Sequence, residues 1–197
     1  RFFASIMLIA FFCGADHASA KELTEAVRTL APLSLPYGIH SLRINGHDMV
    51  IIKAHSGSED AWGGDGYTLM IAQNTLWQWV RLEGNRAHDP TIWSELHTNE
   101  DAITSITFMI PKGQTPRKTK ELYLLKTHRT YRESPLDSTV AEFTLYRLTY
   151  DTDVGIFTLD KIMSEASTKH YCDSDIAAFQ ELAIPLPKAK PVMPCLK

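Results

Sequence analysis

An antiparallel β-sandwich of about eight strands, mostly β with a short helix near each end, is the fold that this sequence predicts. Short segments in which apolar and polar residues alternate recur along the middle of the chain. The dipeptide Asn45-Gly46 stands between two of them and favours a type I′ hairpin, because both residues tolerate a positive φ. Helical spacing of apolar residues occurs near the two ends. A half-open barrel is the alternative architecture.

The first half of the chain is predicted to contain one helix and four strands. Leu23, Val27 and Leu30 recur at helical spacing, which predicts a helix over residues 21–31 that Pro32 ends. Strands are expected at residues 40–44, 49–54, 67–73 and 76–83, and loops at 55–66 and 85–90.

The second half is predicted to contain four more strands and one helix. The strands are expected at residues 105–110, 121–129, 140–150 and 156–162, with a basic turn at 111–118. A helix should follow Cys172, capped by Asp173 or Ser174. Its buried stripe would be formed by Ile176, Phe179 and Leu182.

The first twenty residues resemble a signal peptide. Arg1 precedes an apolar run that ends at Phe12 and is too short to span a bilayer, and the small residues Ala18-Ser19-Ala20 follow it. We therefore expect cleavage after Ala20 and a periplasmic or secreted protein with no membrane segment after cleavage. A retained membrane anchor is the alternative. The mature chain would be a single β-sandwich domain over residues 21–184, followed by a tail rich in Pro and Lys over 185–197.

The export prediction also bears on the three cysteines. Cys13 lies in the leader, which leaves Cys172 and Cys195 in the mature chain. Two cysteines in an exported protein are expected to form one disulfide bond. The alternative is two free thiols.

Composition and missing motifs exclude several functions. The formal net charge of −3 argues against a nucleic-acid partner. The sequence contains no Ser-x-x-Lys or Lys-Thr-Gly of serine β-lactamases, no Gly-x-Ser-x-Gly elbow and no His-Glu-x-x-His zinc motif. We therefore expect a binding protein without catalytic residues or a cofactor.

Weaker patterns suggest binding residues. His47, His55 and Asp60 are the candidate ligands of a hard cation, with separate solvated side chains as the alternative. Aromatic and acidic residues of the glycine-rich segment, together with two arginines, are the candidates for binding a ligand or a protein partner. They are His55, Asp60, Trp62, Asp65, Tyr67, Arg129 and Arg132. The arginines have a second interpretation as members of a surface salt-bridge cluster.

Two further tryptophans lie in one predicted strand. Trp77 and Trp79 share a strand face with Arg81, whereas Leu76 and Val80 belong to the other face. Both faces carry apolar side chains, which indicates a central strand packed in the core. Formation of a homodimer through one face is the alternative.

Three segments together resemble the carbapenem self-resistance proteins of the CarG type. They are Leu42-Arg43-Ile44-Asn45-Gly46 with Val50-Ile51-Ile52-Lys53 and Gly66-Tyr67; Arg129 with Ser134, Asp137 and Val140-x-x-Phe143-x-x-Tyr146-x-Leu148; and Thr168-Lys169-His170-Tyr171-Cys172-Asp173 with Ala178-Phe179 and Glu181-Leu182. Their order along the chain, from about residue 37 to 182, carries the resemblance.

This resemblance implies a periplasmic β-sandwich whose fold is related to periplasmic inhibitors of invertebrate-type lysozyme. It also implies protection against a β-lactam, specifically a carbapenem, without hydrolysis of the drug. The alternative partner is a cell-wall-associated protein, which the chain would bind as an inhibitor of a lysozyme-like hydrolase.

Overall fold

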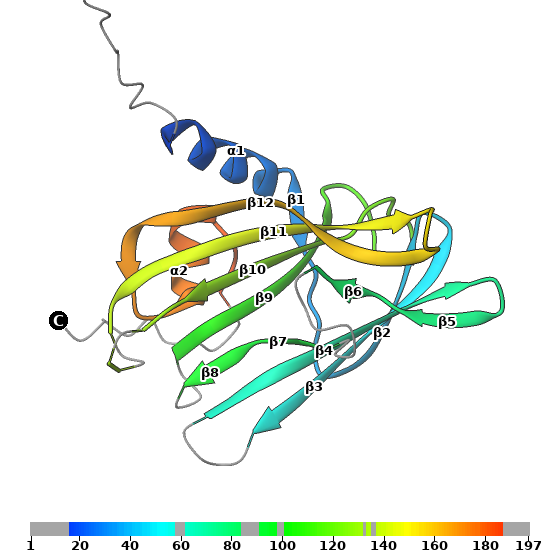
Figure 1. The fold of residues 1–197 in the computed structure, drawn as a ribbon, viewed down its shortest axis with the longest axis horizontal. Helices are drawn as coiled ribbons and strands as arrows, with labels where there is room; N and C mark the ends of the chain where they lie inside the picture. The colour runs from blue at the N-terminus through cyan, green and yellow to red at the C-terminus, as the bar shows by residue number, and fades with distance from the viewer. Residues whose placement is uncertain are drawn as a thin grey trace, which may run out of the picture.

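The computed structural model describes residues 16–57, 62–83, 91–97, 101–131, 133–134 and 137–186. In this part of the chain lie the helices α1 (Asp16–Arg28) and α2 (Ser174–Leu182) (Figure 1). The strands are β1 (Leu30–Pro32), β2 (Gly38–Ile44), β3 (His47–Gly57), β4 (Trp62–Gln73), β5 (Leu76–Trp79), β6 (Arg81–Leu82), β7 (Thr91–Trp93), β8 (Glu95–His97), β9 (Asp101–Pro111), β10 (Tyr123–Arg129), β11 (Thr139–Asp151) and β12 (Ile156–Tyr171).

The strands belong to one hydrogen-bonded sheet that folds over on itself into two layers. The order along the sheet is β2-β3-β4-β8-β9-β10-β11-β12-β6, while β5 and β7 also pair with β4, and β1 pairs with β9. Figure 1 shows β2, β3 and β4 in one layer and β9 to β12 in the other. The predicted β-sandwich is therefore confirmed, with twelve strands in the described residues.

One segment passes from the first layer to the second. β5 pairs with β4, and beyond Val80 the chain continues as β6, which lies parallel to β12. The sequence predicts one strand over 76–83, but Val80, whose side chain is fully buried, separates this segment into the two strands β5 and β6. This second connection between the layers gives the sandwich the character of a half-open barrel.

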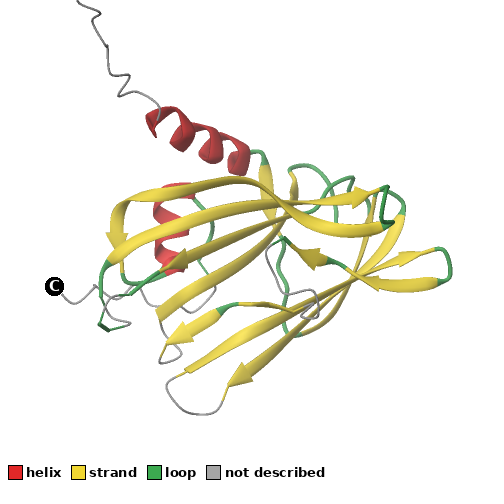
Figure 2. Cartoon of the chain, in the orientation of Figure 1, coloured by secondary structure: helices red, strands yellow, loops and turns green. Residues whose placement is uncertain are grey.

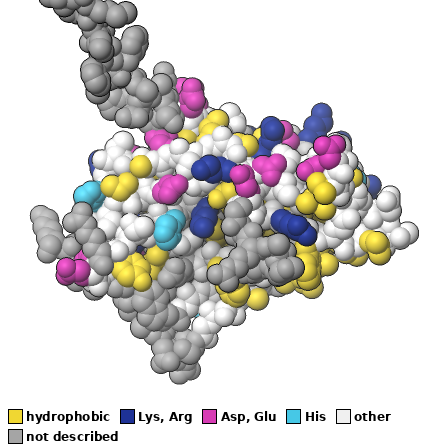
Figure 3. Space-filling model, in the orientation of Figure 1, with side chains coloured by type: hydrophobic (Ala, Val, Ile, Leu, Met, Phe, Trp, Pro, Cys, Tyr) yellow, Lys and Arg dark blue, Asp and Glu magenta, His cyan; other side chains and the backbone are white. Residues whose placement is uncertain are grey.

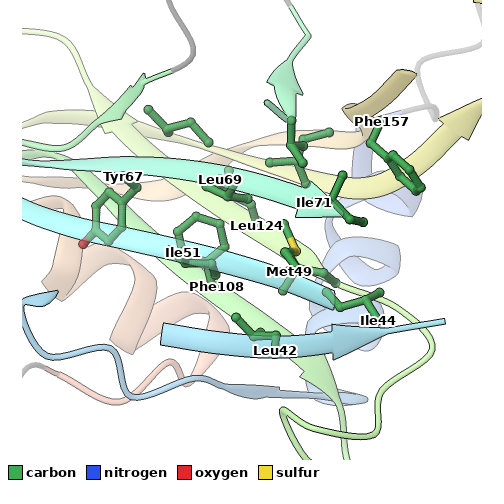
Figure 4. Packing of buried hydrophobic residues seen from close by; sticks show 14 of the residues in the cluster. Leu42, Ile44, Met49, Ile51, Tyr67, Leu69, Ile71, Phe108, Leu124 and Phe157 are labelled. Atoms are coloured by element: carbon green, nitrogen blue, oxygen red, sulfur yellow. The ribbon is translucent and has the colours of Figure 1, made fainter. Parts of the chain in front are cut away.

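The main core fills the space between the layers. Apolar side chains of β2, β3 and β4 meet those of β9, β10, β11 and β12 there, as Figure 4 shows. The labelled residues are Leu42, Ile44, Met49, Ile51, Tyr67, Leu69 and Ile71 from the first layer and Phe108, Leu124 and Phe157 from the second. Alternation along β3 and β4 sends every second side chain into this core.

A second core lies on the outer face of the β9–β12 layer, where both helices cover the sheet (Figure 2). Leu23 and Val27 of α1 and Ile176 and Leu182 of α2 are buried in it. Phe179 was expected in the buried stripe, but it is 47% exposed, so that expectation is wrong. The small side chains Ala177 and Ala178 make the contact instead because they allow close approach of the helix.

Positive φ angles set two hairpin turns. Asn45 has φ 48° and Gly46 has φ 88° between the paired residues Ile44 and His47, which confirms the predicted type of turn. Asn74 has φ 56° in the turn between β4 and β5. These local signals fix the register of β2 with β3 and of β4 with β5.

The glycine-rich stretch 55–66 is mainly strand, which corrects the predicted loop. β3 continues to Gly57 and β4 begins at Trp62. Gly66 is required for packing, because a Cβ atom there would lie 3.0 Å from the ring of Trp93. Gly66, which suggests a turn when only the sequence is known, therefore allows Trp93 to cover the strand.

The first helix is shifted relative to the prediction. α1 begins at Asp16 and ends at Arg28, and residues 30–32 form β1 rather than a last helical turn. Among the described residues, none of the helices is long and apolar enough to cross a membrane. The expected leader lies largely outside the described residues, and cleavage after Ala20 stays a prediction.

Candidate functional site

Three of the predicted binding residues meet at one end of the first layer. His55 of β3 pairs in register with Asp65 of β4, and Lys53 pairs with Tyr67. The Asp65 carboxylate lies 2.9 Å from Lys53 Nζ and 3.2 Å from His55 Nδ1. It also accepts a hydrogen bond of 3.0 Å from the hydroxyl of Tyr37. We call Tyr37, Lys53, His55, Asp65 and Tyr67 the Asp65 cluster.

Aromatic rings enclose the cation of this cluster. Lys53 Nζ lies 4.9 Å from the ring centroid of Tyr37 and 5.5 Å from that of Tyr67. Tyr67 is buried against Phe108, and burial, followed by the charge of Asp65, raises the pKa of its hydroxyl. Burial and Asp65 also raise the pKa of Tyr37. Both phenols therefore stay protonated at neutral pH.

The contacts of Asp65 indicate a structural role for its carboxylate. One oxygen faces Lys53, and the other faces Tyr37 and His55. The backbone of Asp65 is held as well, because its N–H donates to Ser94 Oγ at 2.8 Å and its carbonyl accepts from Ser94 N–H at 2.9 Å. The cluster ties β3, β4 and the segment after β7 together at this end of the sheet.

Arg129 is wholly buried, which corrects both sequence interpretations of it as a surface residue. Its side chain is 0% exposed. Arg129 Nε donates to the carbonyl of Ala102 and Nη1 donates to the carbonyl of Asp137, each at 3.2 Å. A buried guanidinium that donates to backbone carbonyls holds the chain together. It is not accessible to a ligand carboxylate.

Other residues of the CarG-like segments surround the same buried position. Asp173 caps α2 and its second oxygen accepts a hydrogen bond of 3.1 Å from Ala102 N–H. The Asp137 carboxylate accepts hydrogen bonds from the N–H groups of Glu133 and Ser134. The carbonyl of Ala102 thus accepts a hydrogen bond from Arg129, and its N–H donates one to Asp173. These contacts support the fold.

Several predicted residues lie outside the described part of the chain. They are Asp60, Arg132 and Cys195, and the side chain of Trp62 is not described either. Cys172 is buried at the end of β12. Its pairing with Cys195 stays a prediction.

The candidate metal ligands are separated by their local contacts. His47 Nδ1 lies 3.3 Å from the carbonyl of Ala72, and its ring packs edge-on against Phe157. His55 faces Asp65 at the other end of β3. Within the described residues, no three His, Cys, Asp or Glu side chains are grouped to hold a metal ion. A hard cation held with Asp60 stays a prediction.

A basic pocket lies at the opposite end of the first layer, beside the hairpin turn at Asn45-Gly46. Its volume is about 630 Å³, within the usual range for small-molecule sites. Four cations line it, and its described lining includes no Asp or Glu. The lining residues are Arg43, Asn45, Gly46, Gly113, Gln114, Thr115, Arg117, Lys118, Thr119 and Lys120. We call this the basic pocket.

Hydrogen bonds hold the walls of the basic pocket in place. Arg43 N–H donates to the carbonyl of Pro116 at 2.8 Å, and Asn45 N–H donates to that of Thr119 at 2.9 Å. The Gln114 side-chain oxygen accepts bonds from Thr119 Oγ1 at 2.7 Å and from Lys120 N–H at 2.8 Å. A second pocket of about 680 Å³ shares Gln114 and Arg117 with it. The basic residues therefore stand on a fixed framework.

Sequence reasoning did not select this pocket as a site. The basic turn at 111–118 was visible, but Arg43 joins it through an isolated bridge between Ile44 and Thr119, far apart in the sequence. Lys53 and Tyr37 were also missed, because only the pairing of β3 with β4 brings Lys53 to Asp65. The charge of Lys53 within an apolar strand was the one available signal.

The fold and these sites define a two-layer β-sandwich protein with a basic surface pocket. Its structure is similar to the crystal structure of CarG, with a TM-score of 0.61 and 17% sequence identity over 77% of this chain and 94% of that one. No protein-family model matches the sequence, and neither does any curated protein. The CarG-like resemblance is therefore confirmed for the fold.

Proposed function

We propose that this chain is an exported, non-enzymatic protein that protects against a β-lactam of the carbapenem class by binding it. The similarity to CarG across most of the chain is the observation that carries this proposal. The sequence lacks the motifs of serine β-lactamases, which is consistent with binding rather than hydrolysis.

The basic pocket is the proposed binding site. Carbapenems carry a carboxylate next to the fused ring system, and a guanidinium can hold a carboxylate through two parallel hydrogen bonds. Arg43 and Arg117 both line the pocket, with Lys118 and Lys120 beside them. Its volume of about 630 Å³ suits a ligand of this size.

Bacterial survival and drug integrity test the proposal together. The full chain, with its leader, is expressed in a carbapenem-sensitive strain, and a version without residues 1–20 serves as the control for export. We expect a higher inhibitory concentration of imipenem only with the leader. The ultraviolet absorbance of the carbapenem ring should stay constant when purified protein is added. Equal sensitivity of the two strains, or steady loss of absorbance, would contradict the proposal.

The alternative function, inhibition of a lysozyme-like hydrolase, has less support than carbapenem binding. An inhibitor of this kind would need an exposed loop to enter the enzyme's cleft, and most of the predicted loop at 55–66 is paired strand. Inhibition of a lysozyme-like hydrolase stays a prediction from the resemblance.

A further inference from the structure

Three exposed tryptophans share the outer face of the first layer. Trp77 is 49% exposed, Trp79 56% and Trp93 48%. Their partners on β4 are Ala72, Met70 and Gly66, respectively. Those partners are separated by even numbers of residues, so all three tryptophans project from the same side of the sheet. We call this surface the tryptophan face. The expectation that Trp77 and Trp79 pack in the core is therefore wrong.

The tryptophans follow one line. β5 and β7 both pair with the same side of β4, at consecutive positions along it. The strand rise places Trp77 about 7 Å from Trp79, and Trp93 about 14 Å farther along. Thr91 lies between Trp79 and Trp93 in this row. Gly66 beneath Trp93 lets the indole lie against the strand.

The described surface beside this row is mainly apolar. Val50, Ile52, Thr68, Met70 and Ala72 continue the same face across β3 and β4 and are all half-buried. The charges that border this face are Arg81, two residues after Trp79, and the pair Arg43 and Asp48 at its edge, where Arg43 Nε lies 3.9 Å from Asp48 Oδ1. In Figure 3, most of the charged side chains in view lie over the other layer, while hydrophobic ones gather below them. A neutral partner therefore complements the face better than a charged one.

The size of the tryptophan face argues against a second copy of the chain. Four strand columns and six residues of length cover about 400 Å² of sheet at the usual strand spacings. A stable protein interface buries about 800 Å² on each partner. The face is therefore small for a dimer interface, whereas a narrow, extended ligand could cover the tryptophan row.

We propose that the tryptophan face binds a chain of neutral sugar rings. Each pyranose ring presents C–H groups on its flat faces, and these carry the partial positive charge that the electron-rich face of an indole attracts. A row of exposed indoles along one side of β4 suits an extended glycan whose successive rings lie over successive tryptophans. The hydroxyl groups of Thr91 within the row and of Thr68 beside it lie 3.4 Å apart, and each retains acceptor capacity for a sugar hydroxyl.

Titration of intrinsic tryptophan fluorescence tests this inference. Cellohexaose and chitohexaose are the probes, because they share neutral β-linked rings and differ in the N-acetyl group. We expect saturable quenching by at least one of them. Trp79→Ala should weaken binding roughly fivefold or more, because it removes the middle ring of the row. Phe179→Ala removes an equally exposed aromatic residue from α2 and should leave binding unchanged.

Two results would overturn the inference. One is the absence of quenching by both oligosaccharides, together with identical behaviour of wild type and Trp79→Ala. The other is a dimeric mass by light scattering that Trp79→Ala converts to a monomer, which would assign the face to a second copy. Carbapenem binding in the basic pocket is independent of either result, because the two sites share only Arg43 at their borders.

Discussion

Lys53 Nζ lies 2.9 Å from Asp65 Oδ2, and both side chains are mostly shielded from water. The pair joins neighbouring strands at the end of the first layer, under the rings of Tyr37 and Tyr67. Asp65 looks like a ligand-binding residue in the sequence because it lies among glycines and aromatic residues. In the structure, its carboxylate contacts Lys53, Tyr37 and His55.

Asp65→Asn should therefore destabilise the protein. The change removes the negative charge opposite the half-buried Lys53 and weakens the hydrogen bond from Tyr37. We expect the free energy of unfolding to fall by about 1.5–3 kcal/mol, the usual contribution of a hydrogen bond to a charged group. Urea denaturation measures this difference. Asp48→Asn, in the exposed pair with Arg43, is the matched control and should cost less than about 0.5 kcal/mol. Equal effects of the two changes would refute the structural role.

Asp173 should have two separable contributions to stability. Its Oδ1 accepts hydrogen bonds from Asp175 N–H and Ile176 N–H at the start of α2, while Oδ2 accepts from Ala102 N–H. Asp173→Ser keeps an N-cap but is too short to serve Ala102 as well. We expect Asp173→Ser to cost about 1–3 kcal/mol for the unsatisfied Ala102 amide. Asp173→Ala should cost about 1 kcal/mol more for the lost cap. Thermal unfolding of the three proteins gives the order, and an Asp173→Ser protein as stable as wild type would contradict the second contact.

Glu165 makes stability depend on pH. Burial, and then the nearby Glu181 carboxylate, raise the pKa of Glu165 above its ordinary value. Folding therefore favours the protonated acid, and this contribution is present below the unfolded pKa and lost as pH rises through the folded one. Glu165→Gln should consequently raise the melting temperature relative to wild type at pH 7 but not at about pH 4. Glu25→Gln on the exposed side of α1 should show the same small change at both values. A gain at pH 4 alone would show that the sign is wrong.

The predicted disulfide has a direct chemical check. If Cys172 and Cys195 are joined, the intact mass of the exported protein should increase by about two hydrogen atoms on reduction. Cys172→Ser should abolish this increase. An unchanged mass on reduction would leave both cysteines as thiols.

Local signals predicted the parts of the fold that depend on a few adjacent residues. Asn45-Gly46 specified a hairpin because its positive φ angles fit one turn type. The burial of Arg129 could not be predicted in this way, because it depends on the carbonyl of Ala102, which comes from another strand. Alternation in the predicted strand over residues 76–83 showed that Trp77 and Trp79 share a face. It could not show that this face lies outside, since only the pairing of β5 with β4 decides which side meets the core.

The glycine-rich segment shows the same limit. Glycines favour turns when nothing else is known, but Gly66 lies within β4 because a ring from β7 covers it. The basic pocket likewise combines Arg43 with a turn about seventy residues later. A site formed by strands that are far apart in the sequence can be predicted only when the pairing register of those strands is known. A single sequence does not specify that register.

Calorimetric titration of the mature protein with imipenem tests the central claim most directly. We expect one saturable site on the wild-type protein. The double change Arg117→Glu and Lys118→Glu should weaken binding at least roughly tenfold, because each lost charged hydrogen bond costs about 1.5–3 kcal/mol. Lys169→Glu, an exposed charge change on β12 outside the pocket, should bind as wild type does. No heat of binding to the wild-type protein, or equal affinity of the pocket variant, would contradict carbapenem binding in the basic pocket.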